Sequence, residues 1–487
     1  MLDILQLFCY HSNYITPEGE SFVGNDELDK GTGWDACFLT GSFFDFKGDG
    51  KMDMLSENVR RIYFKYLTAA FGSALISSIY GIVDMAMVGQ YQGPGGTAAL
   101  AVVAPIWNII YSLGLLTGIG GSVLLGSAKG KGRPKEQNEY FSTALIGTII
   151  LAAFCWGAVL FFDTEMLTLF GAGETLLPLA KAYLVPIKYV IPAFLFNQML
   201  AAFLRNDDVP GLAATAVLTG GIFNVFGDYF FVFTLDMGIQ GAGLATAIGA
   251  VITCAVMLSH FFTQKNNLHF IFPSFFIKKA WQILVVGFST FIIDVAMGFL
   301  TMIFNRQIVR YFGTDALSVY GVIVNVSTIV QCCAYSVGQA AQPILSVNYG
   351  SRNWERIRET LRYALYTSAF FSAAWTISIW TVPNGFIRVF MAPTEAVCQI
   401  APSIMRSYGI SFLLLPLNVF STYYFQSLMK PGASFFVSVA RGMVVSGILI
   451  YVLPALAGAE FIWFAMPVTE LLTALAVIIL MIRYTAK

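Results

Sequence analysis

Residues 77–91 read "SSIYGIVDMAMVGQY", an apolar run that carries a single carboxylate, Asp84. Its neighbours suit lipid or a dry protein core, where an unpaired charge is unfavourable. Similar apolar runs recur along nearly the whole chain, and 57% of its 487 residues are hydrophobic against 11% charged. Because a helix of about 20 apolar residues crosses a bilayer, this pattern predicts an all-α membrane protein with many spans.

The composition argues against several other classes of protein. The net charge is zero, so no nucleic-acid partner is implied. The seven cysteines show no metal-ligand spacing and the three histidines form no cluster. The chain also lacks the G-x-x-x-x-G-K-[ST] motif of nucleotide-driven pumps, and no set of residues suggests an enzyme.

Twelve membrane spans are expected from the hydropathy pattern. Their approximate bounds are 62–90, 97–128, 137–162, 178–204, 210–233, 239–263, 280–312, 315–346, 357–382, 398–429, 431–456 and 460–484. Basic residues gather in alternate connections, including Lys129, Lys131 and Arg133 after the second span. The positive-inside rule then places both termini in the cytoplasm, which requires an even number of spans.

The chain also repeats itself, which indicates a duplicated unit of six spans. Matching positions, at offsets of 217 and 221, are Asn108 with Asn325, Gly121 with Gly338, and Pro210-Gly211 with Pro431-Gly432. Since six is even, both copies enter the membrane in the same sense. We therefore expect two six-helix lobes related by a pseudo-two-fold axis along the membrane normal, with a substrate cleft between them. The expected N-lobe is 56–265 and the C-lobe is 266–487.

Residues 1–55 differ in composition from the rest and do not resemble a signal peptide. Two interpretations are open. The segment is a disordered cytoplasmic tail, or translation begins at Met52 or Met54.

Four side chains with oxygen atoms stand out in the first half. At about 1.5 Å per residue, Asp84, Asp228 and Thr246 each lie roughly 8 to 10 Å below the outer end of their span. Asn224 shares a helix face with Asp228, and Tyr80 shares one with Asp84, because each pair is four residues apart. These positions predict a cluster at one depth.

Two carboxylates in a poorly solvated pocket repel each other, so the pair favours holding a proton or a small hard cation. The alternative is structural, with each acid tied to a backbone amide or to Lys188. In the second half Thr301 stands where the first has Asp84. Since the repeated scaffold does without this acid, packing alone does not require it.

The substrate cleft has weaker candidates. Lys188 lies near the middle of its span, where it either lines the cleft or pairs with an acid. Asp294 either contacts a cationic substrate or pairs with Arg306. We also assign Asn197 and Gln339 to this cleft.

Four segments make the chain resemble the multidrug and toxic compound extrusion (MATE) family, over roughly residues 58–485. They are "YGIVDMAMVGQYQGPGGTAALAV", "NVFGDYFFVF", "GIQGAGLATAIG" and "GQAAQPILSVNYGSRN". The resemblance implies export of cationic or amphipathic compounds driven by inward Na⁺ or H⁺. It also implies a prokaryotic-type N-lobe ion site, at Asp84, Asn224, Asp228 and Thr246 with the Ala242 carbonyl and Tyr80 beside them.

The expected protein is thus a monomeric antiporter of the cell inner membrane, without a cofactor. The alternative is a flippase of the same superfamily that moves lipid-linked precursors. One departure from the family concerns the first span. Its segment "YLTAAFGSA" (66–74) lacks the proline with which many members bend this helix.

Overall fold

The computed structural model describes residues 53–391 and 393–485, which form helices and short connections without any strand. The residues 1–52 that hold most of the expected N-terminal extension lie outside this range. Proline opens α3 (Pro134–Leu169), α6 (Pro210–Tyr229), α10 (Pro383–Phe390) and α13 (Pro431–Val439), where its missing N–H costs no hydrogen bond.

The remaining elements follow one another along the chain. In the first part they are α2 (Val59–Gly130), α4 (Leu177–Ile187), η1 (Lys188–Val190), α5 (Ile191–Asn206), η2 (Phe230–Thr234), α7 (Gly238–Leu258) and η3 (Ser259–Phe262). In the second part they are α8 (Phe276–Gly350), α9 (Trp354–Thr381), α11 (Glu395–Gly409), η4 (Ile410–Leu413), α12 (Leu415–Ser427), η5 (Ala440–Val444), α14 (Val445–Ala457), η6 (Ala459–Phe464) and α15 (Ala465–Thr485).

The two longest helices, α2 and α8, each fold back at a glycine. Gly93 has φ 65° and ψ −154°, and Gly313 has φ 77° and ψ −162°, which are not helical. Phe304 and Tyr320 would lie about 24 Å apart along a straight helix. Their ring centroids are instead 5.1 Å apart. Each of these elements is therefore a pair of antiparallel helices joined at one residue.

Within residues 53–391 and 393–485, ten helices are long and apolar enough to cross a membrane, so the protein is a multi-pass membrane protein. This set counts α8 once, although it folds back on itself, and α9 falls outside it. The segments expected around 178–204, 398–429 and 431–456 each contain a short 3-10 or π segment between two helices. The short helix α10 was not expected from the sequence.

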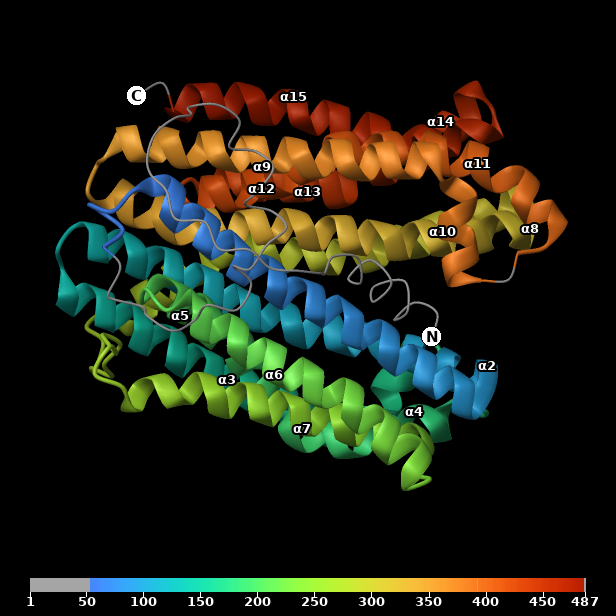
Figure 1. Cartoon of the computed structure of the whole chain (residues 1–487), viewed down its shortest axis with the longest axis horizontal. Helices are drawn as coiled ribbons and strands as arrows, with labels where there is room; N and C mark the ends of the chain where they lie inside the picture. Colours follow the sequence, from blue (N-terminus) through green and yellow to red (C-terminus); the bar gives the residue numbers. More distant parts are fainter. Residues whose placement is uncertain (1–52, 392, 486–487) are drawn as a thin grey trace, which may run out of the picture. The chain divides into compact units, whose positions relative to one another are not determined.

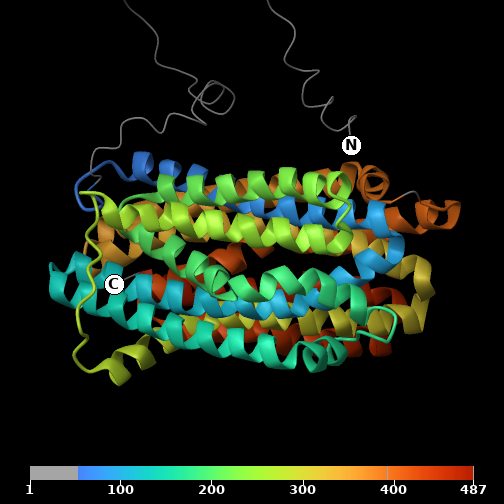
Figure 2. The same ribbon diagram turned by 90° about the horizontal axis from the view of Figure 1, so that it is seen from below.

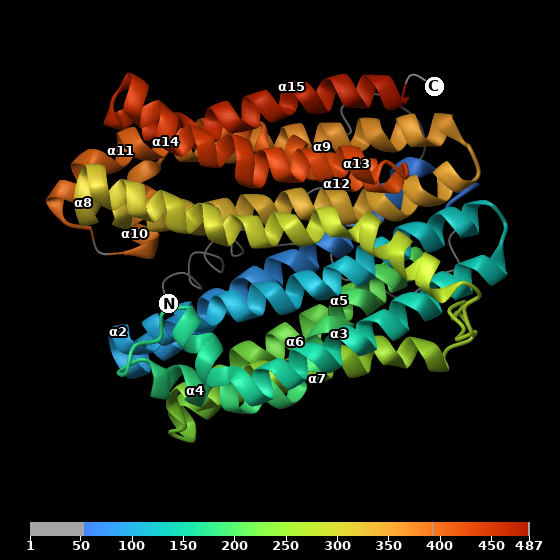
Figure 3. The same ribbon diagram turned by 180° about the vertical axis from the view of Figure 1, so that it is seen from behind.

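The buried apolar side chains separate largely by sequence. One core cluster is drawn from residues 88–247 and another from residues 304–466. In Figures 1 and 3 helices α3 to α7 lie together and helices α9 to α15 lie together, with parts of α2 and α8 between them. Figure 2 shows that the long helices share one general direction.

The first turns of α2 and α8 pack across this division. Tyr63 donates a hydrogen bond to Thr367 of α9 at 3.1 Å, and its ring stacks on Tyr363. At the start of α8, Ile283 and Val286 are buried with side chains of α2 and α5. Each half of the chain therefore contributes the start of a helix to the core of the other half.

Glycines bring α2 and α8 into backbone contact. A Cβ atom at Gly120 would lie 2.2 Å from the Ile283 carbonyl oxygen, and one at Gly287 would lie 2.0 Å from that of Leu116. Nearer the ends of the same helices, a Cβ at Gly130 would lie 1.9 Å from the Val347 oxygen. No side chain fits at these positions, so the contact between the halves depends on glycine.

The segment that connects the two halves is bonded to the first half. Asp207 accepts hydrogen bonds from His260 and from both the backbone and side-chain nitrogens of Asn267. Further along, Ser274 and Lys279 donate to Glu139 of α3. These contacts hold residues 260–279 against α3 and the end of α5.

Candidate ion-binding site

The four oxygen-bearing side chains expected at one depth come from three helices. Asp84 lies in α2, Asn224 and Asp228 lie in α6, and Thr246 lies in α7. The exposed fractions of Asp84, Asn224 and Asp228 are 8%, 3% and 0%. Three polar side chains thus lie almost entirely within the apolar first half.

Small residues let the three helices approach closely. A Cβ at Gly249 of α7 would lie 2.8 Å from the Gly220 carbonyl oxygen of α6, and one at Gly221 would lie 2.8 Å from Ile76 of α2. One turn along this contact, the Asn224 amide donates a hydrogen bond to the Thr246 hydroxyl at 3.1 Å. Close packing of α6 and α7 therefore brings two of the expected residues together.

Asp84 joins the cluster through a residue that the sequence analysis did not identify. Tyr183 of α4 donates a hydrogen bond to Asp84 Oδ2 at 2.7 Å. The charges of Asp84 and Asp228 lie close enough to interact. Tyr183 is five residues past the expected start of its span at 178, so the depth rule applied to tyrosines could have found it.

Four acceptor atoms in this cluster are buried without a hydrogen-bond partner among the described residues. They are Asp84 Oδ1, Asn224 Oδ1 and both carboxylate oxygens of Asp228. Buried acceptors without donors cost free energy unless a proton or a cation satisfies them. Oxygen ligands from carboxylate, amide and hydroxyl groups are those that a hard cation takes. The cluster thus has more buried hydrogen-bond acceptors than donors, as a proton- or cation-binding site does.

Two other expected members lie beside these atoms. Ala242 is fully buried on α7, one turn before Thr246. Tyr80 lies one turn before Asp84, and a Cβ at Gly221 would lie 3.3 Å from its ring. Among the described residues, no group of three or more histidine, cysteine or acidic side chains gathers as it does at many transition-metal sites.

Two of the residues assigned to a cleft make bonds within the first half. The Lys188 ammonium lies 3.5 Å from Asp163, which Lys181 also approaches at 3.5 Å. The Asn197 amide donates to the Ala250 carbonyl at 3.0 Å, which ties α5 to α7. Lys188 thus follows the acid-paired alternative, with Asp163 as its partner.

The other two lie nearer the meeting of the halves. Asp294 of α8 accepts a hydrogen bond from Tyr335 at 2.9 Å and lies within reach of Ser112 of α2. Its second oxygen is buried without a partner among the described residues. Gln339 interacts with the Tyr423 hydroxyl. Asp294 therefore sits between the halves rather than in an ion pair with Arg306.

Buried acids on facing helices of a multi-pass helical protein are typical of membrane transporters. Comparison with known proteins identifies the family. The MatE family model matches residues 69–230 and 282–452, so the chain belongs to the MatE family. This confirms the resemblance seen in the sequence.

Individual relatives agree with this assignment. The chain is 22% identical over 411 residues to the multidrug export protein MepA of Staphylococcus saprophyticus, covering 84% of this chain and 90% of the relative. It is 21% identical over 410 residues to MepA of Staphylococcus aureus, covering 83% and 90%. Its fold is similar to the outward-facing conformation of a multidrug resistance MATE family transporter of the MOP superfamily, with a TM-score of 0.83, 18% identity and coverage of 90% and 99%.

Proposed function

We propose that the protein exports small amphipathic or cationic organic compounds across the cell membrane in exchange for Na⁺ or H⁺. The observation that carries this proposal is the set of four buried acceptor atoms on Asp84, Asn224 and Asp228 that have no hydrogen-bond partner in the described part of the chain. The MepA relatives are named for multidrug export, which supports the substrate class. Nothing in these names favours the lipid-linked flippase alternative.

We further propose an architecture of twelve spans in two six-helix lobes, 56–265 and 266–487, related by an axis along the membrane normal. The fold-back of α8 at Gly313 supports this count, because it divides one long helix into two spans. With α9 added, the ten candidate helices become twelve. In this architecture both termini are cytoplasmic and the monomer is the working unit.

The coupling follows from the chemistry of the cluster. A proton or Na⁺ that binds between Asp84 and Asp228 removes their mutual repulsion, so it favours the arrangement of α2, α4, α6 and α7 in which these oxygens are closest. If substrate binds better in the other arrangement, the bound ion lowers the affinity for substrate, and bound substrate lowers the affinity for the ion by the same factor. An inward ion gradient then drives substrate outward.

The test is dye efflux from proteoliposomes with imposed Na⁺ or pH gradients. Asp84→Asn and Asp228→Asn should each abolish gradient-driven efflux. An amide keeps the shape of the side chain, but it cannot accept a proton and offers no negative charge to Na⁺. Asp315→Asn is the matched control, since Asp315 is an exposed acid in α8 far along the chain from the cluster. Retention of gradient-driven efflux in both site variants would exclude this cluster as the coupling site.

A further inference from the structure

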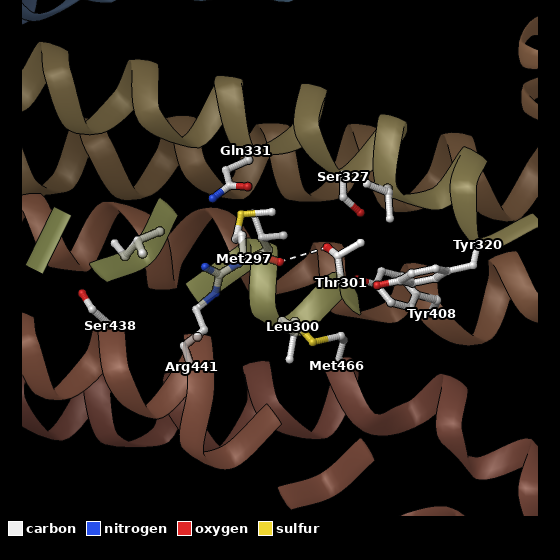
Figure 4. Close-up of a pocket in the computed structure, with 14 residues that line it drawn as sticks. Met297, Leu300, Thr301, Tyr320, Ser327, Gln331, Tyr408, Ser438, Arg441 and Met466 are labelled. Carbon is white, nitrogen blue, oxygen red and sulfur yellow. Dashed lines mark hydrogen bonds between the residues drawn. The ribbon is translucent and has the colours of Figure 1, made fainter. Parts of the chain in front are cut away.

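The second half of the chain contains a cavity of about 40 Å³. One water needs about 10–15 Å³ of such space, so the cavity holds a few waters or one small ion. It lies between α8, α11, α15 and the π segment η5. Its polar lining consists of Thr301, Tyr320, Ser327, Gln331, Tyr408, Ser438 and Arg441. Figure 4 shows Arg441 entering from one side, with Ser327 and Gln331 opposite.

Arg441 supplies the charge that faces this cavity. It is 7% exposed, and its Nε donates to Glu470 Oε1 at 2.7 Å. The other oxygen of Glu470 accepts from Asn418 at 2.6 Å. Glu470 does not line the cavity, whereas Arg441 does. Both carboxylate oxygens are thus engaged behind the cavity, and the guanidinium keeps donors for a ligand within it.

Local backbone geometry places the arginine there. Arg441 lies in η5, a single π-helical turn between α13 and α14. Such turns insert an extra residue into a helix and are frequent at functional sites. In the first half, the matching stretch around Gly220 is regular α-helix in α6. The first half has its own π segment, η2, but it lies further along the equivalent span, after α6.

The other polar groups that line the cavity are hydroxyls and the Gln331 amide, which can donate or accept. Ser327 is 8% exposed, and its hydroxyl interacts with that of Tyr408. Tyr408 adds a second hydroxyl. No acidic side chain lines the cavity among the described residues. A buried hydroxyl and a guanidinium that face one small space fit a ligand that accepts hydrogen bonds and carries negative charge.

The internal repeat allows this cavity to be compared with the first-half cluster. Thr301, which lines the cavity, occupies the position that Asp84 holds in the first half. Among the described residues, the first-half cluster offers buried acceptors without donors, and the second-half cavity offers a guanidinium without an acidic wall. Equivalent places in the two halves therefore have opposite chemical preferences.

We propose that this cavity binds a small monovalent anion of halide size, held by Arg441 with the hydroxyls of Ser327 and Tyr408. The anion is a second ligand, distinct from the coupling cation and the exported compound. Its binding stabilises the packing of η5 and α15 against α8.

The experiment measures thermal unfolding of the purified full chain in lipid nanodiscs. Chloride replaces gluconate at constant pH, Na⁺ concentration and ionic strength. The wild type should show a saturable rise in Tm with chloride, and bromide should act similarly. The Ser327→Val, Tyr408→Phe double variant keeps the Arg441–Glu470 pair. Its half-saturating chloride concentration should rise at least about tenfold, which corresponds to a loss of ~1.4 kcal/mol in binding free energy.

A second variant removes the charge without leaving its partner buried and unpaired. Arg441→Gln combined with Glu470→Gln keeps the pair neutral and should lose the chloride-dependent rise. Asp84→Asn should keep it, so the result does not depend on the proposed transport cycle. The proposal is overturned if chloride and gluconate act alike on the wild type. It is equally overturned if chloride saturates the wild type and the Ser327→Val, Tyr408→Phe variant at the same concentration.

Discussion

At the residue scale, the side chains of the first-half cluster differ in how many oxygen atoms they leave for a proton or a metal cation. Asp84 has one oxygen bonded to Tyr183, while both oxygens of Asp228 are without partners among the described residues. Asn224 uses its amide nitrogen on Thr246 and leaves its oxygen unpaired. A proton needs only one carboxylate oxygen, whereas a metal cation needs several oxygen ligands at once. The hydroxyl of Thr246 therefore distinguishes the two possible coupling ions.

Thr246→Val tests this distinction. The change keeps the side-chain shape and removes the hydroxyl. It should therefore raise the Na⁺ concentration for half-maximal efflux about tenfold, which corresponds to a loss of ~1.4 kcal/mol in Na⁺ binding free energy. Efflux driven by a pH gradient should stay unchanged. Thr219→Val on the same half is the control, because Thr219 is exposed and donates only to Thr215 of its own helix. An equal loss of pH-driven efflux in Thr246→Val would contradict the prediction.

Much of this cluster could be predicted because helix rise is constant. Counting residues from the span ends placed Asp84, Asp228 and Thr246 at one depth without any knowledge of packing. The pairing of Lys188 with Asp163 could not be predicted, since it depends on how α3 and α4 turn toward each other. The same holds for Asp294 and Tyr335, which lie 41 positions apart on one folded-back helix.

At the element scale, single glycines convert two long helices into hairpins. Gly93 and Gly313 both have positive φ with ψ near −160°, a region that only glycine occupies without strain. Neither would bring a Cβ within 4 Å of another atom, so the backbone conformation alone requires glycine. The sequence indicated a break near each site but not its form, because a one-residue joint and a short loop have similar hydropathy.

Alanine at these positions should therefore destabilise the protein. Gly93→Ala and Gly313→Ala should each cost about 1–3 kcal/mol, the usual strain of such a conformation, and lower the Tm in detergent. Gly81→Ala is a matched control in α2, because Gly81 is helical and its Cβ would meet open space. That variant should keep or raise the Tm. Equal Tm values for all three variants would show that the joints tolerate a side chain.

At the scale of the whole molecule, the two halves meet through side chains such as Tyr63 and Tyr363 and also through backbone contacts between α2 and α8. The contacts at Gly120, Gly130 and Gly287 leave no room for a methyl group. Gly350 repeats the pattern, since a Cβ there would lie 2.2 Å from the Ser127 oxygen. The contact is specific to one relative placement of α2 and α8, so a motion that separates these parts of the two helices must break it.

Gly287→Ala should accordingly shift the population toward separated helix ends. The measurement is the distance distribution between spin labels at Lys131 and Arg352, which are exposed just beyond the ends of α2 and α8. The variant should add a longer distance that is minor in the wild type. Gly298→Ala in α8 is the control, because its Cβ would meet no atom within 4 Å. An unchanged distribution in Gly287→Ala would show that the interface adjusts without opening.

The tie between the connecting segment and the first half has a mechanical consequence. Because Asp207 and Glu139 hold this segment at both ends, its residues offer no free length when the halves move apart. Phe275, which has φ 56° and an exposed side chain immediately before α8, lies between Ser274 and Lys279, and both of these residues are bonded to Glu139. The connecting segment therefore belongs mechanically to the first half, because it is bonded to that half as far as the first turn of α8, and it does not act as a slack tether.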